Sequence, residues 1–140
     1  MRYWEDMAAG ETHRYGRHEL SADEIADFGA RFAVPAVAGA EPGAAPGHLL
    51  CCIAMRLLVD HALSGMASLG SPGVDHIDWP VPAYAGDVLY LSTEMLSLRP
   101  LESRPEMGLV KQRVTLSNQH GEAVARLATN AFVARRGVSA

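Results

Sequence analysis

Residues 48 to 63 constrain the fold of this chain most, because they form a helix-length stretch that is apolar on nearly every side. Its strongly polar interior positions are Arg56, Asp60 and His61. A helix that is apolar all round is one that protein is expected to surround. The preceding Pro46-Gly47 pair closes a loop rich in proline and glycine, which marks the start of this helix. The rest of the chain is therefore predicted to wrap around one central helix.

Two elements are expected ahead of the central helix. Residues 11 to 20 alternate loosely between apolar and polar side chains, which predicts a short strand. Ser21 followed by Glu24 is the pattern of a capping box, in which each residue satisfies a free backbone amide of the other at a helix start. Apolar side chains then recur at helical steps and give this helix one apolar stripe: Ile25, Phe28 and Phe32.

Beyond residue 73 the apolar period changes to two, which indicates strands. We expect them at residues 76–81, 88–99, 110–117 and 122–136. Gly121 closes a predicted hairpin turn that needs a positive φ. Consecutive strands joined by tight turns form an antiparallel sheet. A long curled antiparallel sheet around a central helix at about residues 47–64 is the α+β hotdog fold. We predict it as a single domain over residues 1–140, with another α+β sandwich as the alternative.

The composition argues against several kinds of partner. The formal charge of -4 and the isoelectric point near 5.8 do not favour nucleic acid or an anionic membrane. The longest unbroken apolar run, Leu49 to Ala54, is followed by Met55 and then by Arg56, and is short for a membrane span. Acidic residues stand near the N-terminus where a signal peptide has an apolar segment. We therefore expect a cytoplasmic protein without a membrane or nucleic-acid partner.

The two cysteines do not predict a special chemistry. Cys51 and Cys52 are adjacent, so their side chains diverge on a helix and cannot close an unstrained disulfide. We interpret them as helix packing rather than as reactive thiols. Metal-ligand spacing, a glycine-rich phosphate loop and a Gly-x-Ser-x-Gly turn do not occur in the sequence, so neither a metal nor a cofactor is expected.

Short motifs follow one another along the chain in a fixed order: Tyr3-Trp4-Glu5-Asp6, Met55 to Asp60, Ala67 to Asp75, Trp79-Pro80-Val81, Ala85-Gly86-Asp87, Arg99-Pro100, Ser103 to Glu106, and Asn118 to Glu122. Together they resemble the MaoC-like dehydratase family of single hotdogs, which includes (R)-specific enoyl-CoA hydratases. The resemblance implies a hydratase or dehydratase whose ligand is acyl-CoA or another acyl thioester. It also implies a homodimer with sheets joined edge to edge and the thioester tunnel at the interface.

The same resemblance places two catalytic positions ahead of the central helix. An aspartate and a histidine there hold the water that adds across the enoyl double bond, and this chain has Ala33 and Ala38 instead. Neither alanine can act as a base, an acid or a water ligand. Three functions therefore stay open: a divergent hydro-lyase or thioesterase, a non-catalytic acyl-CoA-binding protein or partner subunit of an active homologue, and a small-molecule binder unrelated to coenzyme A.

The resemblance also names candidate site residues. A backbone amide at the start of the central helix polarises the thioester carbonyl, which assigns this role to Gly47, where free amides and the helix dipole favour negative charge. His48 and Glu41 are the candidate acid–base groups; the alternatives are a histidine packed at a helix start and a solvated loop carboxylate. The strand that lines the interface groove supplies the candidate substrate-binding residues: Gly73, Asp75, His76 and Trp79.

The arginines divide into two groups. Arg56 is expected to pair with Asp60, one helical turn further on, and to be structural. Because guanidinium groups suit phosphate oxygens, four others are candidates for contacts with the phosphates of coenzyme A: Arg99, Arg104, Arg135 and Arg136.

Overall fold

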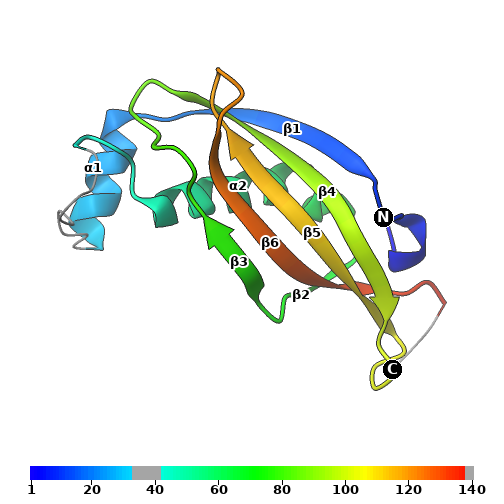
Figure 1. Ribbon diagram of the computed structural model, residues 1–140. Helices are drawn as coiled ribbons and strands as arrows, with labels where there is room; N and C mark the ends of the chain where they lie inside the picture. Colours follow the sequence, from blue (N-terminus) through cyan, green and yellow to red (C-terminus); the bar gives the residue numbers. More distant parts are fainter. Residues whose placement is uncertain (33–41, 138–140) are drawn as a thin grey trace.

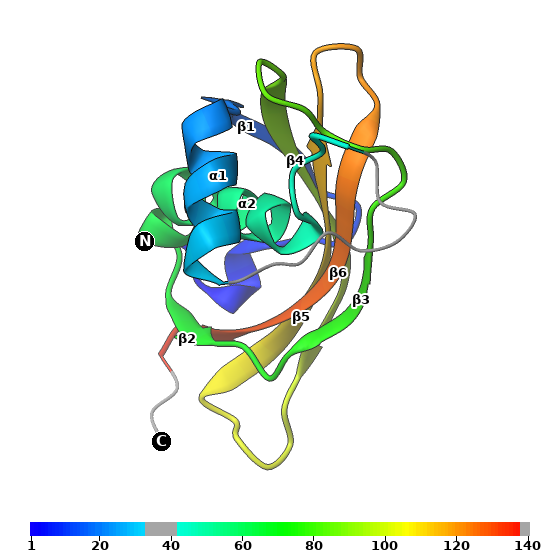
Figure 2. The same cartoon turned by 90° about the vertical axis from the view of Figure 1, so that its left-hand side faces the viewer.

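The computed structural model describes residues 1–32 and 42–137. The elements along the chain are η1 (Trp4–Asp6), β1 (Thr12–Glu19), α1 (Ala22–Arg31), α2 (Gly47–His61), η2 (Leu63–Gly65), β2 (Ser68–Gly70), β3 (Val74–Asp78), β4 (Val88–Pro100), β5 (Met107–Ser117) and β6 (Ala123–Ala134). The strands form one antiparallel sheet in the order β1-β4-β5-β6-β2, and β3 also pairs with β6. Figures 1 and 2 show this sheet curling around α2.

Helix α2 lies in the concave face of the sheet, which confirms the predicted hotdog architecture. One side of the helix is buried, and its side chains are Leu49, Leu50, Ile53, Ala54 and Leu57. They pack with inward residues of the long strands: Leu89, Leu91, Val114, Leu116 and Val124. The alternation seen in the sequence of β5 thus places every second side chain against the helix.

The opposite side of α2 is exposed in the single chain, so the expectation of enclosure on nearly every side is wrong. Met55 and Val59 are 53% and 44% exposed. The expected Arg56–Asp60 pair is present at 2.9 Å, on this exposed side. By length and composition alone, residues 47–65 could also cross a membrane, a criterion that the core helix of a soluble protein meets as well. The unbroken apolar run from Leu49 to Ala54 is shorter than a membrane span, whereas the mean hydropathy of the whole helix stays high despite its few polar residues.

The capping box at the start of α1 is confirmed. The Ser21 hydroxyl accepts from the Glu24 amide at 3.1 Å, and the Glu24 carboxylate accepts from the Ser21 amide at 2.9 Å. The same carboxylate also meets Nε2 of His18 on β1 at 2.9 Å, a contact that the sequence pattern did not reveal. Ile25 and Phe28 pack against the core, so α1 lies beside the start of α2 (Figure 1).

Two strands differ from the sequence prediction. Strand β3 covers Val74–Asp78 rather than residues 76–81, because Pro80 has no amide proton with which to continue the ladder. Strand β2, Ser68–Gly70, was missed, because three residues are too few to show a period. Both short strands pair with β6 and continue the sheet along the side next to α2.

A bulge in β1 receives the end of α2. The register of β1 shifts between Tyr15 and His18, and Gly16 there has φ +42°. A Cβ at Gly16 would lie 2.5 Å from Nε2 of His61, the last residue of α2. The His61 ring also stacks on Tyr15 with 6.4 Å between centroids. His61 therefore has a packing role.

The N-terminal segment and the residues that follow β6 are held together at one end of the sheet (Figure 1). The indole of Trp4 packs on Gly108 and donates from Nε1 to the Leu109 carbonyl at 3.3 Å. Arg135 stacks over the same indole at 5.5 Å. Acidic groups of the N-terminal segment and of the β4–β5 loop meet the arginines proposed for phosphate contacts: Arg135–Glu5 at 3.3 Å, Arg136–Asp6 at 2.6 Å and Arg104–Glu106 at 2.6 Å.

Candidate functional site

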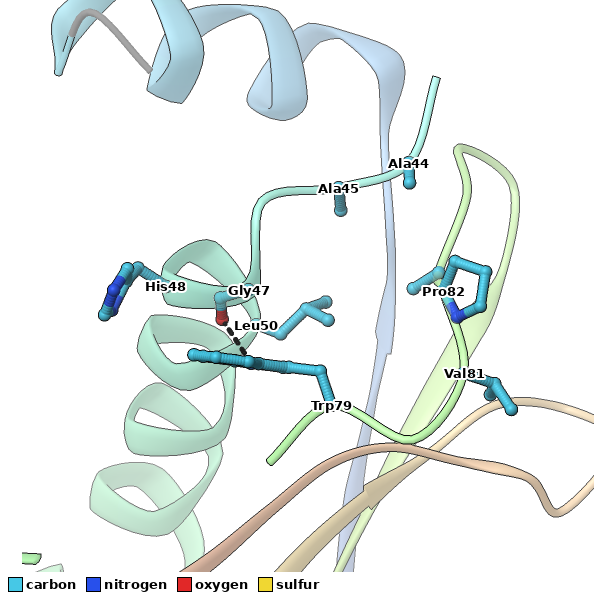
Figure 3. A pocket seen from close by; sticks show the side chains of 9 residues that line it. Ala44, Ala45, Gly47, His48, Leu50, Trp79, Val81 and Pro82 are labelled. Carbon is cyan, nitrogen blue, oxygen red and sulfur yellow. Dashed lines mark hydrogen bonds between the residues drawn. The ribbon is translucent and has the colours of Figure 1, made fainter. Parts of the chain in front are cut away.

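An apolar cavity of about 500 Å³ opens at the N-terminal end of α2 (Figure 3). The segment entering the helix forms one wall with Ala44, Ala45, Gly47, His48 and Leu50. The segment after β3 forms the other wall with Trp79, Val81, Pro82 and Ala83. A concave, mostly apolar space with a few polar groups at its edge is the usual form of a small-molecule site.

Backbone hydrogen bonds hold the two walls together. The Ala45 amide donates to the Ala83 carbonyl at 2.8 Å, and Ala44 forms an antiparallel bridge with Tyr84. The turn that follows is closed by Asp87, whose carboxylate accepts from the Tyr84 amide at 2.9 Å. Two loops that are far apart in the sequence therefore form the walls of the cavity, and the hydrogen bonds between them determine its shape.

Helix α2 begins at the cavity without a side-chain cap. Its N-cap residue is Pro46, which makes no side-chain capping bond, and the first bonds within the helix run from the Leu49 and Leu50 amides to the Pro46 carbonyl. Within residues 1–32 and 42–137, the amides of Gly47 and His48 have no hydrogen-bond partner. Free amides at the positive end of a helix dipole favour an electronegative ligand atom.

Trp79 lies across this first helical turn. Its Nε1 donates to the Gly47 carbonyl at 3.0 Å (Figure 3), and its ring fills the space that a Cβ at Gly47 would need. The structure gives a reason for a glycine at this position, because any larger residue would collide with the indole.

His48 borders the cavity without pointing into its depth. Its ring is exposed and meets the Trp79 ring edge-on, with 5.6 Å between centroids. Figure 3 shows the imidazole on the other side of the first helical turn from Val81 and Pro82. Among the cavity-lining residues that the structure describes, His48 is the one titratable side chain. Its proposed partner, Glu41, lies outside the described residues.

The adjacent cysteines lie in different surroundings. Cys51 is half-buried, and burial raises the pKa of its thiol despite a contact with Trp79. Cys51 therefore stays protonated, which fits packing rather than nucleophilic chemistry. Cys52 is exposed, so the packing interpretation is wrong for that residue. Over the described part of the chain, no three His, Cys, Asp or Glu side chains are placed to hold a metal ion.

Three of the four proposed substrate-binding residues lie on the other face of the sheet. Lys111, which points away from α2, holds Asp75 at 2.9 Å, and this hydrogen bond lowers the pKa of the carboxyl group. Gly73 accepts from the Asn130 side chain at 3.3 Å. His76 lies 3.5 Å from Asp78. His76 and Asp78, two residues apart, share the outer face, and the bulge at Asp75 brings that carboxylate to the same face, so Trp79 alone of the four borders the cavity.

Sequence reasoning missed most of the cavity wall. The residues that it overlooked are small or apolar: Ala44, Ala45, Leu50, Val81, Pro82 and Ala83. Such residues carry no chemical signature, and the two loops that contain them lie on either side of α2 in the sequence. The available signal was the unusual density of alanine and proline in both loops.

Comparison with solved structures places this architecture among known hotdog proteins. A protein of Mycobacterium tuberculosis described as having a double hotdog fold aligns with a TM-score of 0.74 at 21% identity, over 99% of this chain and 46% of that one. The R-hydratase PhaJ1 from Pseudomonas aeruginosa aligns with a TM-score of 0.68 at 16% identity, over 96% and 86% of the two chains. These likenesses establish the hotdog class.

A third solved structure defines the family. The MaoC-like dehydratase from Rhodospirillum rubrum aligns with a TM-score of 0.81 at 30% identity, over 99% of this chain and 100% of that one. The present chain belongs to the MaoC-like dehydratase family. Its sequence matches no protein-family model and no curated protein.

Proposed function

We propose that this chain binds an acyl thioester of the acyl-CoA type in the cavity at the start of α2, as a family member that does not supply its own acid–base pair. The observation that carries the proposal is the apolar cavity of about 500 Å³ beside the amides of Gly47 and His48, which have no hydrogen-bond partner among the described residues. An acyl chain suits the apolar walls, and a thioester carbonyl oxygen suits the amides.

Hydration of an enoyl thioester needs acid–base groups that this chain does not carry at the family positions. Adding water to an enoyl thioester requires a base for the water and an acid for the α-carbon, and such proton transfer contributes about 10²–10⁴-fold. The family positions for these groups carry Ala33 and Ala38, which lie outside the described residues. Among the described lining residues, His48 is the one titratable side chain, and no carboxylate accompanies it.

We infer that a homologous subunit supplies the missing pair. Two solved complexes share this fold: the M. tuberculosis 3R-hydroxyacyl-ACP dehydratase HadBC, at 18% identity and TM-score 0.64, and ChsH1-ChsH2 from the same organism, at 14% and 0.67. Among the described strands, β3 pairs with β6 alone, and the exposed side of α2 carries Met55 and Val59. An edge strand and an exposed apolar helix side are both suited to joining a second hotdog subunit.

A second candidate function is a divergent hydro-lyase or thioesterase that uses His48. The observation in its favour is the place of His48 at the cavity edge, next to the unpaired amides and in contact with Trp79. In this alternative the imidazole moves a proton while the Gly47 amide holds the carbonyl oxygen.

Binding and turnover of short acyl-CoA esters by the purified chain test these proposals. We expect isothermal titration calorimetry to detect butyryl-CoA binding, and we expect crotonyl-CoA hydration to stay at background until a homologue with the aspartate and histidine is added. Turnover by this chain alone that is lost in His48→Ala and kept in Glu41→Ala would establish the second candidate. Absence of acyl-CoA binding would overturn the proposed function.

A further inference from the structure

We propose that Trp79 sets the length of acyl chain that the cavity accepts, and that Gly47 serves this selection by leaving room for the indole. The inference rests on the proposed function, because it concerns the acyl group of the same thioester. It assigns the selective role to one side chain of the segment that follows β3.

The position of the indole is fixed from several directions. Its Nε1 is bound to the Gly47 carbonyl at 3.0 Å, and its ring occupies the site of the missing Cβ. The His48 ring meets it edge-on at 5.6 Å. The preceding residue, Asp78, forms an ion pair with Arg126 of β6 at 2.7 Å. Strand and helix thus hold the ring between them, so its distance from the free amides is set by the backbone.

Trp79 is also the wall residue that most limits the space. Among the described lining residues it carries the largest side chain, whereas Ala44, Ala45 and Ala83 contribute single methyl groups. Leu50 and Ala83 are 2% and 0% exposed and belong to the core, so a change there disturbs folding. Trp79 is 42% exposed. A large side chain that borders the cavity without belonging to the core can determine ligand size at little cost to stability.

A ladder of saturated acyl-CoA esters from butyryl to dodecanoyl tests the inference by calorimetry. We expect Trp79→Ala to raise the affinity for decanoyl-CoA relative to butyryl-CoA about tenfold, since one or two methylene groups in an apolar pocket discriminate to this extent. Gly47→Ala should produce a shift in the same direction, because its methyl group displaces the indole while the backbone amide is kept. Trp79→Phe retains a ring and should shift the ratio least.

Leu96→Ala is the matched control, because Leu96 is 39% exposed on β4 and does not border the cavity. It should leave the chain-length ratio unchanged. Equal loss of affinity for every ester in Trp79→Ala, or an unchanged ratio in both Trp79→Ala and Gly47→Ala, overturns the role of Trp79 while the proposed function stands. A wild-type chain that binds none of the esters overturns both proposals.

Discussion

The two tryptophans of this chain make the same local contact and differ in what surrounds it. Trp4 lies on Gly108 and Trp79 lies on Gly47, and in each case the indole fills the space of the absent Cβ. Each Nε1 donates to a backbone carbonyl, at 3.3 Å for Trp4 and at 3.0 Å for Trp79. Contact with glycine therefore does not by itself distinguish a structural tryptophan from one at a ligand site.

Protein atoms cover the Trp4 ring more fully than the Trp79 ring. Trp4 packs against a second core cluster, formed by Met7, Met66, Met95, Val110 and Val133. Arg135 covers the Trp4 ring at 5.5 Å from its centroid. Trp79 is 42% exposed and faces an open apolar cavity. The cavity therefore lies where the packing around an aromatic ring is incomplete.

The largest expected difference between the two sites is in the stability of the variants that truncate each tryptophan. Trp4→Ala should lower the free energy of unfolding by about 3 kcal/mol, because it leaves a void beside the methionine-rich cluster. Trp79→Ala should lower it by about 1 kcal/mol, because that ring already borders solvent and an existing cavity. Urea denaturation monitored by circular dichroism measures both values. Equal losses would show that the Trp79 end is packed as tightly as the Trp4 end.

Adding a methyl group to each glycine sharpens the same contrast. Gly108→Ala should lower the free energy of unfolding by about 2 kcal/mol, because the half-buried Trp4 ring is held by the Leu109 carbonyl and by Arg135. Gly47→Ala should change it by less than about 0.5 kcal/mol, because the added methyl group displaces a Trp79 ring that is already 42% exposed and alanine favours the helix. Thermal denaturation of both variants provides the measurement, with acyl-CoA binding unaffected in Gly108→Ala. A large loss in Gly47→Ala would show that the Trp79 ring cannot be displaced at little cost.

A smaller effect is expected where α1 is anchored beside the cavity. Partial burial acts to raise the pKa of Glu24, but the Ser21 amide and His18 outweigh it, so the pKa lies below its ordinary value of 4.5. The folded state thus gains stability from ionised Glu24 above pH 4.5, and loses it as the pH falls through the lower folded pKa. We expect Glu24→Gln to cost about 1 kcal/mol at pH 7 and a smaller amount at pH 3, as the carboxylate becomes protonated. Urea denaturation at both pH values would contradict this if the difference were as large in acid.

Local sequence patterns predicted much of the fold, because they act over a few residues. The capping box at Ser21 and Glu24, the hairpin at Gly121 and the alternation in β5 each express a backbone preference that neighbours decide. The central apolar helix then left few arrangements of the sheet. Strand β2 and the end of β3 escaped prediction, because pairing with β6 defines the first and a proline ends the second.

The candidate site was predicted only at the helix start. Gly47, His48 and Trp79 were named from the sequence and lie together, whereas Gly73, Asp75 and His76 were named with them and lie on the outer face. Strand alternation places His76 on the same face as Asp78, and the bulge at Asp75 adds its carboxylate there, since one extra residue changes which side chains face outward.

The amino-acid sequence by itself determined the central helix and the antiparallel strands, because each is a property of residue type and local spacing. Only the tertiary structure decided that Trp79 occupies the space above Gly47 and that two alanine- and proline-rich loops enclose a cavity. Such contacts join segments that chain connectivity keeps apart, so their geometry exists only once the sheet has curled around α2.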